Sequence, residues 1–111
     1  MATSTIPAGV AADAEARVAD LGMRRELDQM LEHTLQSVPG LRAVRVTLEC
    51  DPACPGADPR LVIWAHRDDL PADTGFDPTD WDWGGWQTTS FSPDVCRHFV
   101  MLSVYGDADG R

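Results

Sequence analysis

The sequence predicts a two-layer α+β domain: a long amino-terminal helix, with a carboxy-terminal helix beside it, packed on a small antiparallel sheet of three to four strands. Two apolar runs separated by a turn-rich segment predict the sheet. A stretch with apolar residues three and four positions apart predicts the first helix. The chain has 111 residues, enough for one core. We expect a single domain over residues 12–106, a flexible amino-terminal segment at 1–11 and a polar tail at 107–111.

The first helix is expected to begin at Asp13 and to end before Pro39-Gly40, a helix-stopping pair. Gly22 lowers helix stability by about 1 kcal/mol relative to alanine, so a break or kink is expected there. The helix should lay its apolar stripe on the sheet, and a helix-paired homodimer is the alternative use of that stripe. The stripe consists of Met23, Leu27, Met30, Leu31, Thr34, Leu35 and Val38.

Two antiparallel strands are predicted within residues 41–68. In the first, Val44, Val46 and Leu48 alternate with polar residues, which is typical of a half-buried strand. The second starts at Leu61 and has apolar residues on both faces, which indicates an interior strand. The predicted core comprises Leu27, Leu31, Leu35, Val44, Val46, Leu48, Leu61, Ile63, Phe99 and Leu102.

Two later elements are less well specified by pattern. Residues 77–91 are predicted to form a hairpin with Gly84-Gly85 as its turn, or else a long irregular loop. Residues 93–105 are predicted to form a helix, with Ser92 as N-cap and Pro93 at the first helical position. The run FVMLSVY within it also fits a buried strand, since periodicity does not separate the two.

The net charge of −9 disfavours binding to nucleic acid or to anionic membranes and favours a basic partner. No apolar run is long enough to span a bilayer. The amino terminus lacks the features of a secretory signal, so a cytoplasmic location is expected.

The first candidate site is the acidic tryptophan segment, residues 68–94, which contains seven aspartates and no arginine. Carboxylates beside indole rings suit an arginine side chain, through bidentate hydrogen bonds and a cation–π contact. The alternative is that the tryptophans close the core and the aspartates solvate a loop. The residues predicted to bind a partner are Asp77, Asp80, Trp81, Asp82, Trp83 and Trp86.

A second candidate is a zinc site made of Cys50, Cys54, Cys96 and His98, a suitable tetrahedral ligand set. In a helix, Cys96 and His98 point to nearly opposite sides, so the predicted helix counts against this site. The aspartates at 77–82 also resemble part of a calcium loop, but Phe91 stands where the bidentate glutamate belongs. No cofactor is predicted, with zinc as the alternative.

The third candidate is an acid–base pair of His66 and Asp68, as in a small hydrolase or transferase. No nucleophile, phosphate-binding or metalloprotease motif accompanies it. We therefore favour a non-enzymatic regulatory protein whose acidic, tryptophan-rich surface binds an arginine-bearing protein partner.

Overall fold

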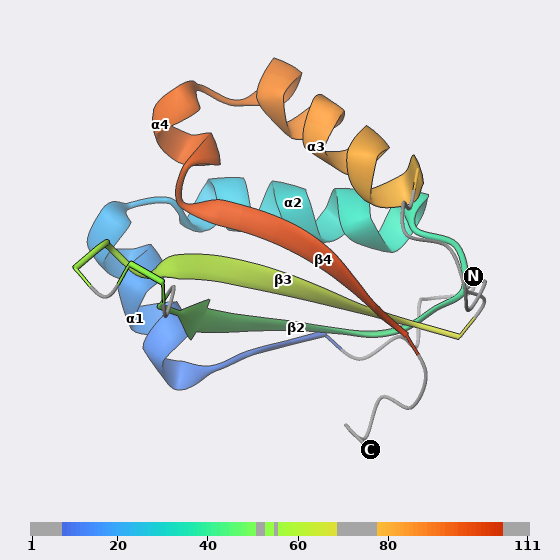
Figure 1. Cartoon of the computed structure of the whole chain (residues 1–111), viewed down its shortest axis with the longest axis horizontal. Coiled ribbons are helices and arrows are strands. Elements are labelled where there is room, and N and C mark those ends of the chain that lie inside the picture. Colours follow the sequence, from blue (N-terminus) through green and yellow to red (C-terminus); the bar gives the residue numbers. More distant parts are fainter. Residues whose placement is uncertain (1–7, 51–52, 55, 69–77, 106–111) are drawn as a thin grey trace.

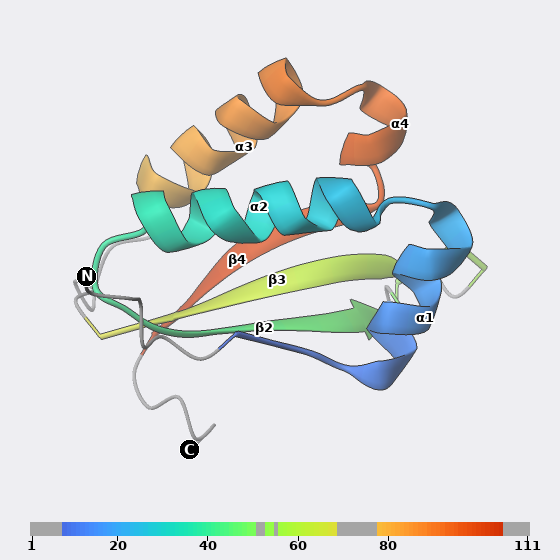
Figure 2. The same ribbon diagram turned by 180° about the vertical axis from the view of Figure 1, so that it is seen from behind.

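The computed structural model describes residues 8–50, 53–54, 56–68 and 78–105. Its strands form one sheet in the order β1-β2-β3-β4. Helices α1 and α2 lie over one face of this sheet and α3 runs along its β4 side (Figures 1 and 2), so the predicted α+β class is confirmed. The elements are β1 (Ala8–Val10), α1 (Ala12–Leu21), α2 (Arg24–Ser37), β2 (Leu41–Glu49), β3 (Arg60–Arg67), α3 (Pro78–Ser90), α4 (Pro93–Cys96) and β4 (Phe99–Tyr105).

The sheet is mixed rather than wholly antiparallel. The central strands β2 and β3 pair antiparallel as predicted, with Val46 opposite Ile63. Both outer pairs, β1 with β2 and β3 with β4, are parallel. Parallel neighbours need a long crossover, which α1 and α2 supply in one half and α3 and α4 in the other. The chain is therefore two strand–helix–helix–strand units joined by the β2–β3 connection.

Strand β1 lies inside the segment that was expected to be flexible. It pairs with β2 from Val44 to Val46, and the Ala11 N–H extends the pairing with a 2.9 Å bond to the Val46 carbonyl. Residues 1–7 and the expected tail at 107–111 lie outside the described residues.

The predicted break in the first helix is confirmed at Gly22, which separates α1 from α2. Gly22 has a φ of 68°, a left-handed conformation that glycine adopts without steric cost. The N–H of Met23 bonds back to the Val18 carbonyl at 3.1 Å, closing the end of α1 as in a Schellman motif. Each helix can then turn its own apolar stripe toward the sheet.

The predicted hairpin at residues 77–91 is wrong, because residues 78–90 form helix α3. Pro78 occupies its first position and Asp80 its first turn, both favourable at a helix start. Two adjacent glycines cost roughly 2 kcal/mol in a helix. Burial of the Trp83 ring contributes more, roughly 4 kcal/mol from the area of an indole. Tertiary packing therefore overrides the local preference of Gly84-Gly85 for a turn.

The predicted helix at residues 93–105 is correct only in its first turn. The Ser92 side chain accepts a 3.4 Å hydrogen bond from the Val95 N–H, as expected of an N-cap. The helix ends at Cys96, and residues 99–105 form β4, the strand that was the alternative interpretation. Pairing with β3 begins where the Leu61 N–H donates to the His98 carbonyl at 2.8 Å.

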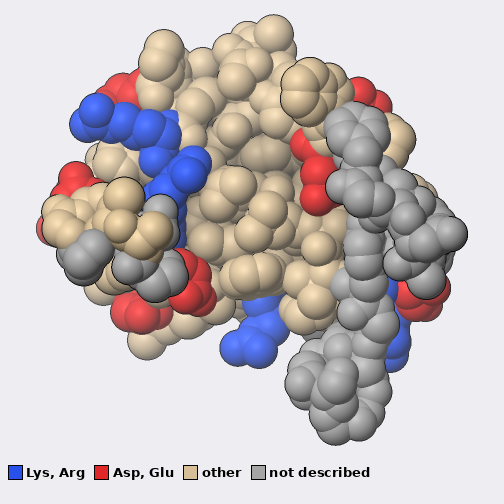
Figure 3. Space-filling model, in the orientation of Figure 1, with Lys and Arg blue, Asp and Glu red and all other residues tan. Residues whose placement is uncertain are grey.

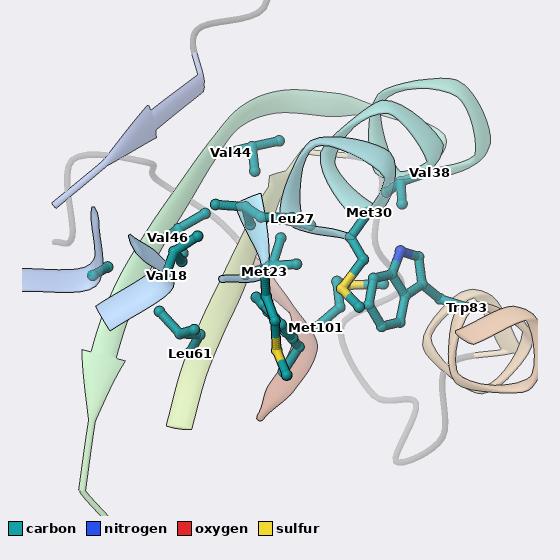
Figure 4. Close-up of a cluster of buried hydrophobic side chains, with 14 residues drawn as sticks. Val18, Met23, Leu27, Met30, Val38, Val44, Val46, Leu61, Trp83 and Met101 are labelled. Atoms are coloured by element: carbon teal, nitrogen blue, oxygen red, sulfur yellow. The ribbon is translucent and has the colours of Figure 1, made fainter. Parts of the chain in front are cut away.

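The core lies between the sheet and the helices (Figure 4). Leu31, Leu35 and Leu48 are only partly buried against it. Leu102 was predicted to be buried but is 40% exposed, because it points to the other face of the sheet. The predicted core residues that are buried are Leu27, Val44, Val46, Leu61, Ile63 and Phe99. Buried residues absent from the predicted core include Val18, Met23, Met30, Trp83 and Met101.

Candidate functional site

Helix α3 distributes the acidic tryptophan segment over different sides of the molecule. Trp83 is 3% exposed, whereas Trp81, two positions earlier, is 72% exposed. Trp86 is partly buried. Positions two apart on a helix do not share a face, so the predicted residues do not form one outward patch. Asp77 lies outside the described residues.

Trp83 is a structural anchor between α3 and α2. Its indole N–H donates to the Thr34 hydroxyl at 3.0 Å, and that hydroxyl donates to the Met30 carbonyl at 2.7 Å. Trp83 and Thr34 are both buried, and the buried polar atoms of both side chains are hydrogen-bonded. Figure 4 shows the indole ring beside Met30. The ring is therefore not available to a partner.

Asp80 is also engaged within the chain, at the outer edge of β4. Its carboxylate accepts hydrogen bonds from both the N–H and the hydroxyl of Ser103. The buried Arg67 guanidinium donates to the same hydroxyl at 3.2 Å. Two helical turns further along α3, the Gln87 amide donates to the Phe99 carbonyl at 3.2 Å. Side chains of α3 thus form hydrogen bonds with backbone groups that an edge strand otherwise exposes to solvent.

The remaining aromatic residue, Trp86, lies in a groove between α2 and α3. Its ring stacks on the His33 imidazole, with ring centroids 3.8 Å apart and planes within 6° of each other. The Phe91 and Trp86 rings pack edge to face, with their centroids 5.4 Å apart. A hollow of about 390 Å³ lies at one side of the stack and one of about 320 Å³ at the other. We call these two hollows and the stack the α2–α3 groove.

The lining of the α2–α3 groove is acidic and polar around its aromatic centre. Glu32 lines the first hollow and Asp82 the second; both side chains are exposed. Among the described residues, no arginine lines either hollow. Burial lowers the pKa of His33 below its usual 6.5, so the imidazole is neutral at pH 7. The described lining of the groove therefore carries negative charge at its rim and no positive charge. The other lining residues are Gln29, Gln36, Ser37, Thr79, Trp83 and Ser90.

The depressed pKa of His33 leads to a testable pH dependence. The unfolded chain binds a proton near pH 6.5, whereas the folded chain binds it only at lower pH. The stabilisation from neutral His33 is therefore present above pH 6.5 and is lost as the pH falls through the folded-state pKa. We expect an NMR titration of the His33 ring to give a midpoint below 6.5, and a midpoint above 6.5 would contradict the packing described.

Of the predicted partner-binding residues, Asp82, Trp83 and Trp86 line the groove, and Trp83 does so as a buried side chain. His33, Glu32 and Phe91 were not among the predicted site residues. Helical spacing could have predicted part of this site. Trp83 and Trp86 are three positions apart and, on a helix, lie near one another on the surface facing α2. Because residues 77–91 were interpreted as a hairpin, the helical spacing of the two tryptophans was not considered.

The residues of the predicted zinc site are not brought together. Cys50 and Cys54 are exposed in the β2–β3 connection. The Cys96 thiol points back to the end of α3, where its sulfur lies 3.5 Å from the Gln87 carbonyl oxygen, and burial raises the pKa of this thiol. Within the described ranges, no three histidine, cysteine or acidic side chains are grouped so as to hold a metal ion.

The predicted acid–base pair is not assembled either. In the part of the chain that the structure describes, His66 Nδ1 is buried without a hydrogen-bond partner. Burial lowers the pKa of His66, and the nearby Arg45 and Arg42 lower it further. Asp68 is exposed, and its backbone N–H bonds to the Gly40 carbonyl at 3.0 Å. His66 lines neither hollow of the groove.

Comparisons with other proteins do not assign the chain to a family. No family model, curated protein or solved structure matches it. Among the described residues, no helix has the length and apolar character needed to cross a membrane. The α2–α3 groove combines a hollowed shape, stacked aromatic rings and acidic side chains.

Proposed function

We propose that this chain is a non-enzymatic interaction protein of the cytoplasm that binds an arginine-bearing segment of a basic protein partner in the α2–α3 groove. One observation supports the proposal: the stacked His33 and Trp86 rings lie between hollows edged by Glu32 and Asp82, and the described lining contains no arginine. A guanidinium group can contact an aromatic ring and a carboxylate at once.

Arginine suits this groove better than lysine. The guanidinium is planar, stacks on rings and donates in a fork, whereas an ammonium is compact and strongly hydrated. The distribution of charge also favours binding of a cationic segment on the helix side of the molecule. Acidic residues outnumber arginines on the helices, whereas arginines outnumber acidic residues on the strands. The field on the helix side therefore attracts a cationic segment toward the groove.

The proposal predicts a loss of affinity when the two rim carboxylates are neutralised. An arginine-rich peptide should bind the Glu32→Gln/Asp82→Asn variant about tenfold more weakly than the wild type, since two charge-assisted contacts are lost. Isothermal titration calorimetry measures the difference. A lysine-rich peptide of equal length and charge should bind the wild type more weakly than the arginine peptide.

A matched control separates a local site from general attraction. The Asp13→Asn/Asp20→Asn variant removes the same charge from exposed positions on α1. It should keep an affinity close to that of the wild type. An equal loss in both double variants, or no preference for arginine over lysine, would reject the groove as the binding site.

A further inference from the structure

The face of the sheet opposite α1 and α2 has no described helix over it. Figure 3 shows this side as a mainly uncharged surface with charged side chains around its margin. Leu102, 40% exposed, belongs to it. Strand alternation and register place a set of mostly apolar side chains here, which we call the open sheet face. Its central members are Thr47, Val62, Trp64, His66, Val100, Leu102 and Val104.

The polar group of the largest ring on the open sheet face is already satisfied. The Trp64 indole N–H donates to the Thr47 hydroxyl at 2.8 Å, and that hydroxyl donates to Glu49 at 2.7 Å. Covering the indole therefore leaves no hydrogen-bond donor unpaired. An unpaired N–H is the main free-energy penalty when a tryptophan is buried in an interface.

The edges of the sheet are poorly suited to pairing with another chain. At β4, Asp80 and Gln87 hold backbone groups of Ser103 and Phe99. At the opposite edge, β1 is only three residues long. Short or occupied edges disfavour strand addition, so the open face is the more suitable contact surface of the sheet.

Charges along the central strands are arranged in a self-complementary way. On β2, Arg45 and Glu49 share the open face with opposite charges toward opposite ends. On β3, Arg60 lies opposite Glu49 and Trp64 lies opposite Arg45 in the strand register. Among the described residues, Arg45 and Arg60 have no ion pair, whereas Arg24 on the helix side is paired with Glu15.

We propose that two copies of this chain associate through their open sheet faces. The two-fold axis lies in the plane between the two sheets and runs perpendicular to the strands. Such an axis lays β2 against its own copy in the reverse direction, so that Arg45 faces Glu49 of the second copy. By the strand register, the same axis sets Trp64, with Leu102 beside it, against the row of Arg60 of the second copy, and Val62 and Val100 lie nearest the axis. The contact lies on the side opposite α2, so it is independent of arginine binding in the groove.

The size of the open sheet face indicates a weak, reversible dimer. Three strands of seven to nine residues and the three-residue β1, spaced about 4.8 Å apart, give a footprint of roughly 400 Å². A standard stable interface buries about 800 Å² per partner. We therefore expect association to depend on concentration across the micromolar to near-millimolar range.

Sedimentation velocity of the full chain tests this dimer. The wild type should shift from monomer to dimer across that range, and Leu102→Asp and Arg45→Glu should each weaken association about tenfold or more. The Arg45→Glu/Glu49→Arg variant should restore it, because the exchanged charges meet again across the axis. Arg25→Glu, an exposed change on the helix side, is the control and should associate like the wild type.

Each other outcome counts against the proposal. A wild type that stays monomeric at near-millimolar concentration would overturn it, and the face would then be free or covered by a different protein. A dimer that survives Leu102→Asp would place the contact elsewhere. Failure of Glu49→Arg to rescue Arg45→Glu would overturn the two-fold arrangement. If Leu102→Asp unfolds, the charge exchange still decides, and arginine-peptide binding measured on Arg45→Glu should be unaffected.

Discussion

Replacing Trp83 with alanine is expected to lower the free energy of unfolding by about 3–5 kcal/mol. The ring is 3% exposed and packs between α3, α2 and the sheet, so its removal leaves a large cavity. The change also removes the indole donor from the Thr34 hydroxyl. A small domain has a total stability of about 5–15 kcal/mol, so the variant should be severely destabilised. Urea denaturation followed by circular dichroism measures the loss.

Trp81→Ala is the matched control in the same helix. Trp81 is 72% exposed, so its removal should change the free energy of unfolding by less than about 1 kcal/mol. Similar losses in the two variants would mean that residues 78–90 do not pack as the helix described.

Asp80→Ala is expected to lower the free energy of unfolding by about 2–3 kcal/mol. The substitution removes the acceptor of both the Ser103 N–H and the Ser103 hydroxyl. It also leaves the buried Arg67 with a less constrained hydroxyl partner. Amide exchange at Ser103 should become faster, because the outer edge of β4 is opened to water. Denaturation and hydrogen-exchange NMR report the two effects.

Asp82→Ala provides the comparison, since Asp82 is exposed and only two residues away. Its effect on unfolding should stay within about 0.5 kcal/mol. The two aspartates are thus expected to separate by role: Asp80 contributes to stability, whereas Asp82 contributes to arginine binding. A large stability loss from Asp82→Ala, with none from Asp80→Ala, would contradict this assignment.

Patterns that extend over a whole element predicted that element correctly. The alternation around Val44 and Val46 predicted β2, and the stripe through Leu27 predicted one long helix, with a kink or break at Gly22. Strand β1 has only three residues and gains its stability from pairing with β2, so no local pattern marks it. The parallel direction of the outer strands was likewise not predicted, because β1 was not expected and the α3 crossover was interpreted as a hairpin.

The candidate site depended on one local choice. Gly84-Gly85 favours a turn on its own, but burial of Trp83 outweighs that preference and produces a helix. With a helix, neighbouring aromatic and acidic residues separate: Trp83 enters the core, Asp80 binds β4 and Asp82 stays at the groove. The proposed arginine site therefore uses only a small part of the segment, Asp82 and Trp86, together with residues of α2.

The most direct test of arginine binding in the α2–α3 groove is a heteronuclear NMR titration that follows the indole N–H signals of the four tryptophans. On addition of an arginine-rich peptide, the Trp86 signal should move most, because its ring lies in the stack with His33. Trp64, on the opposite face of the sheet, should not move. A shift of Trp64 while Trp86 stays in place would show that the peptide binds elsewhere and that the groove is not the site.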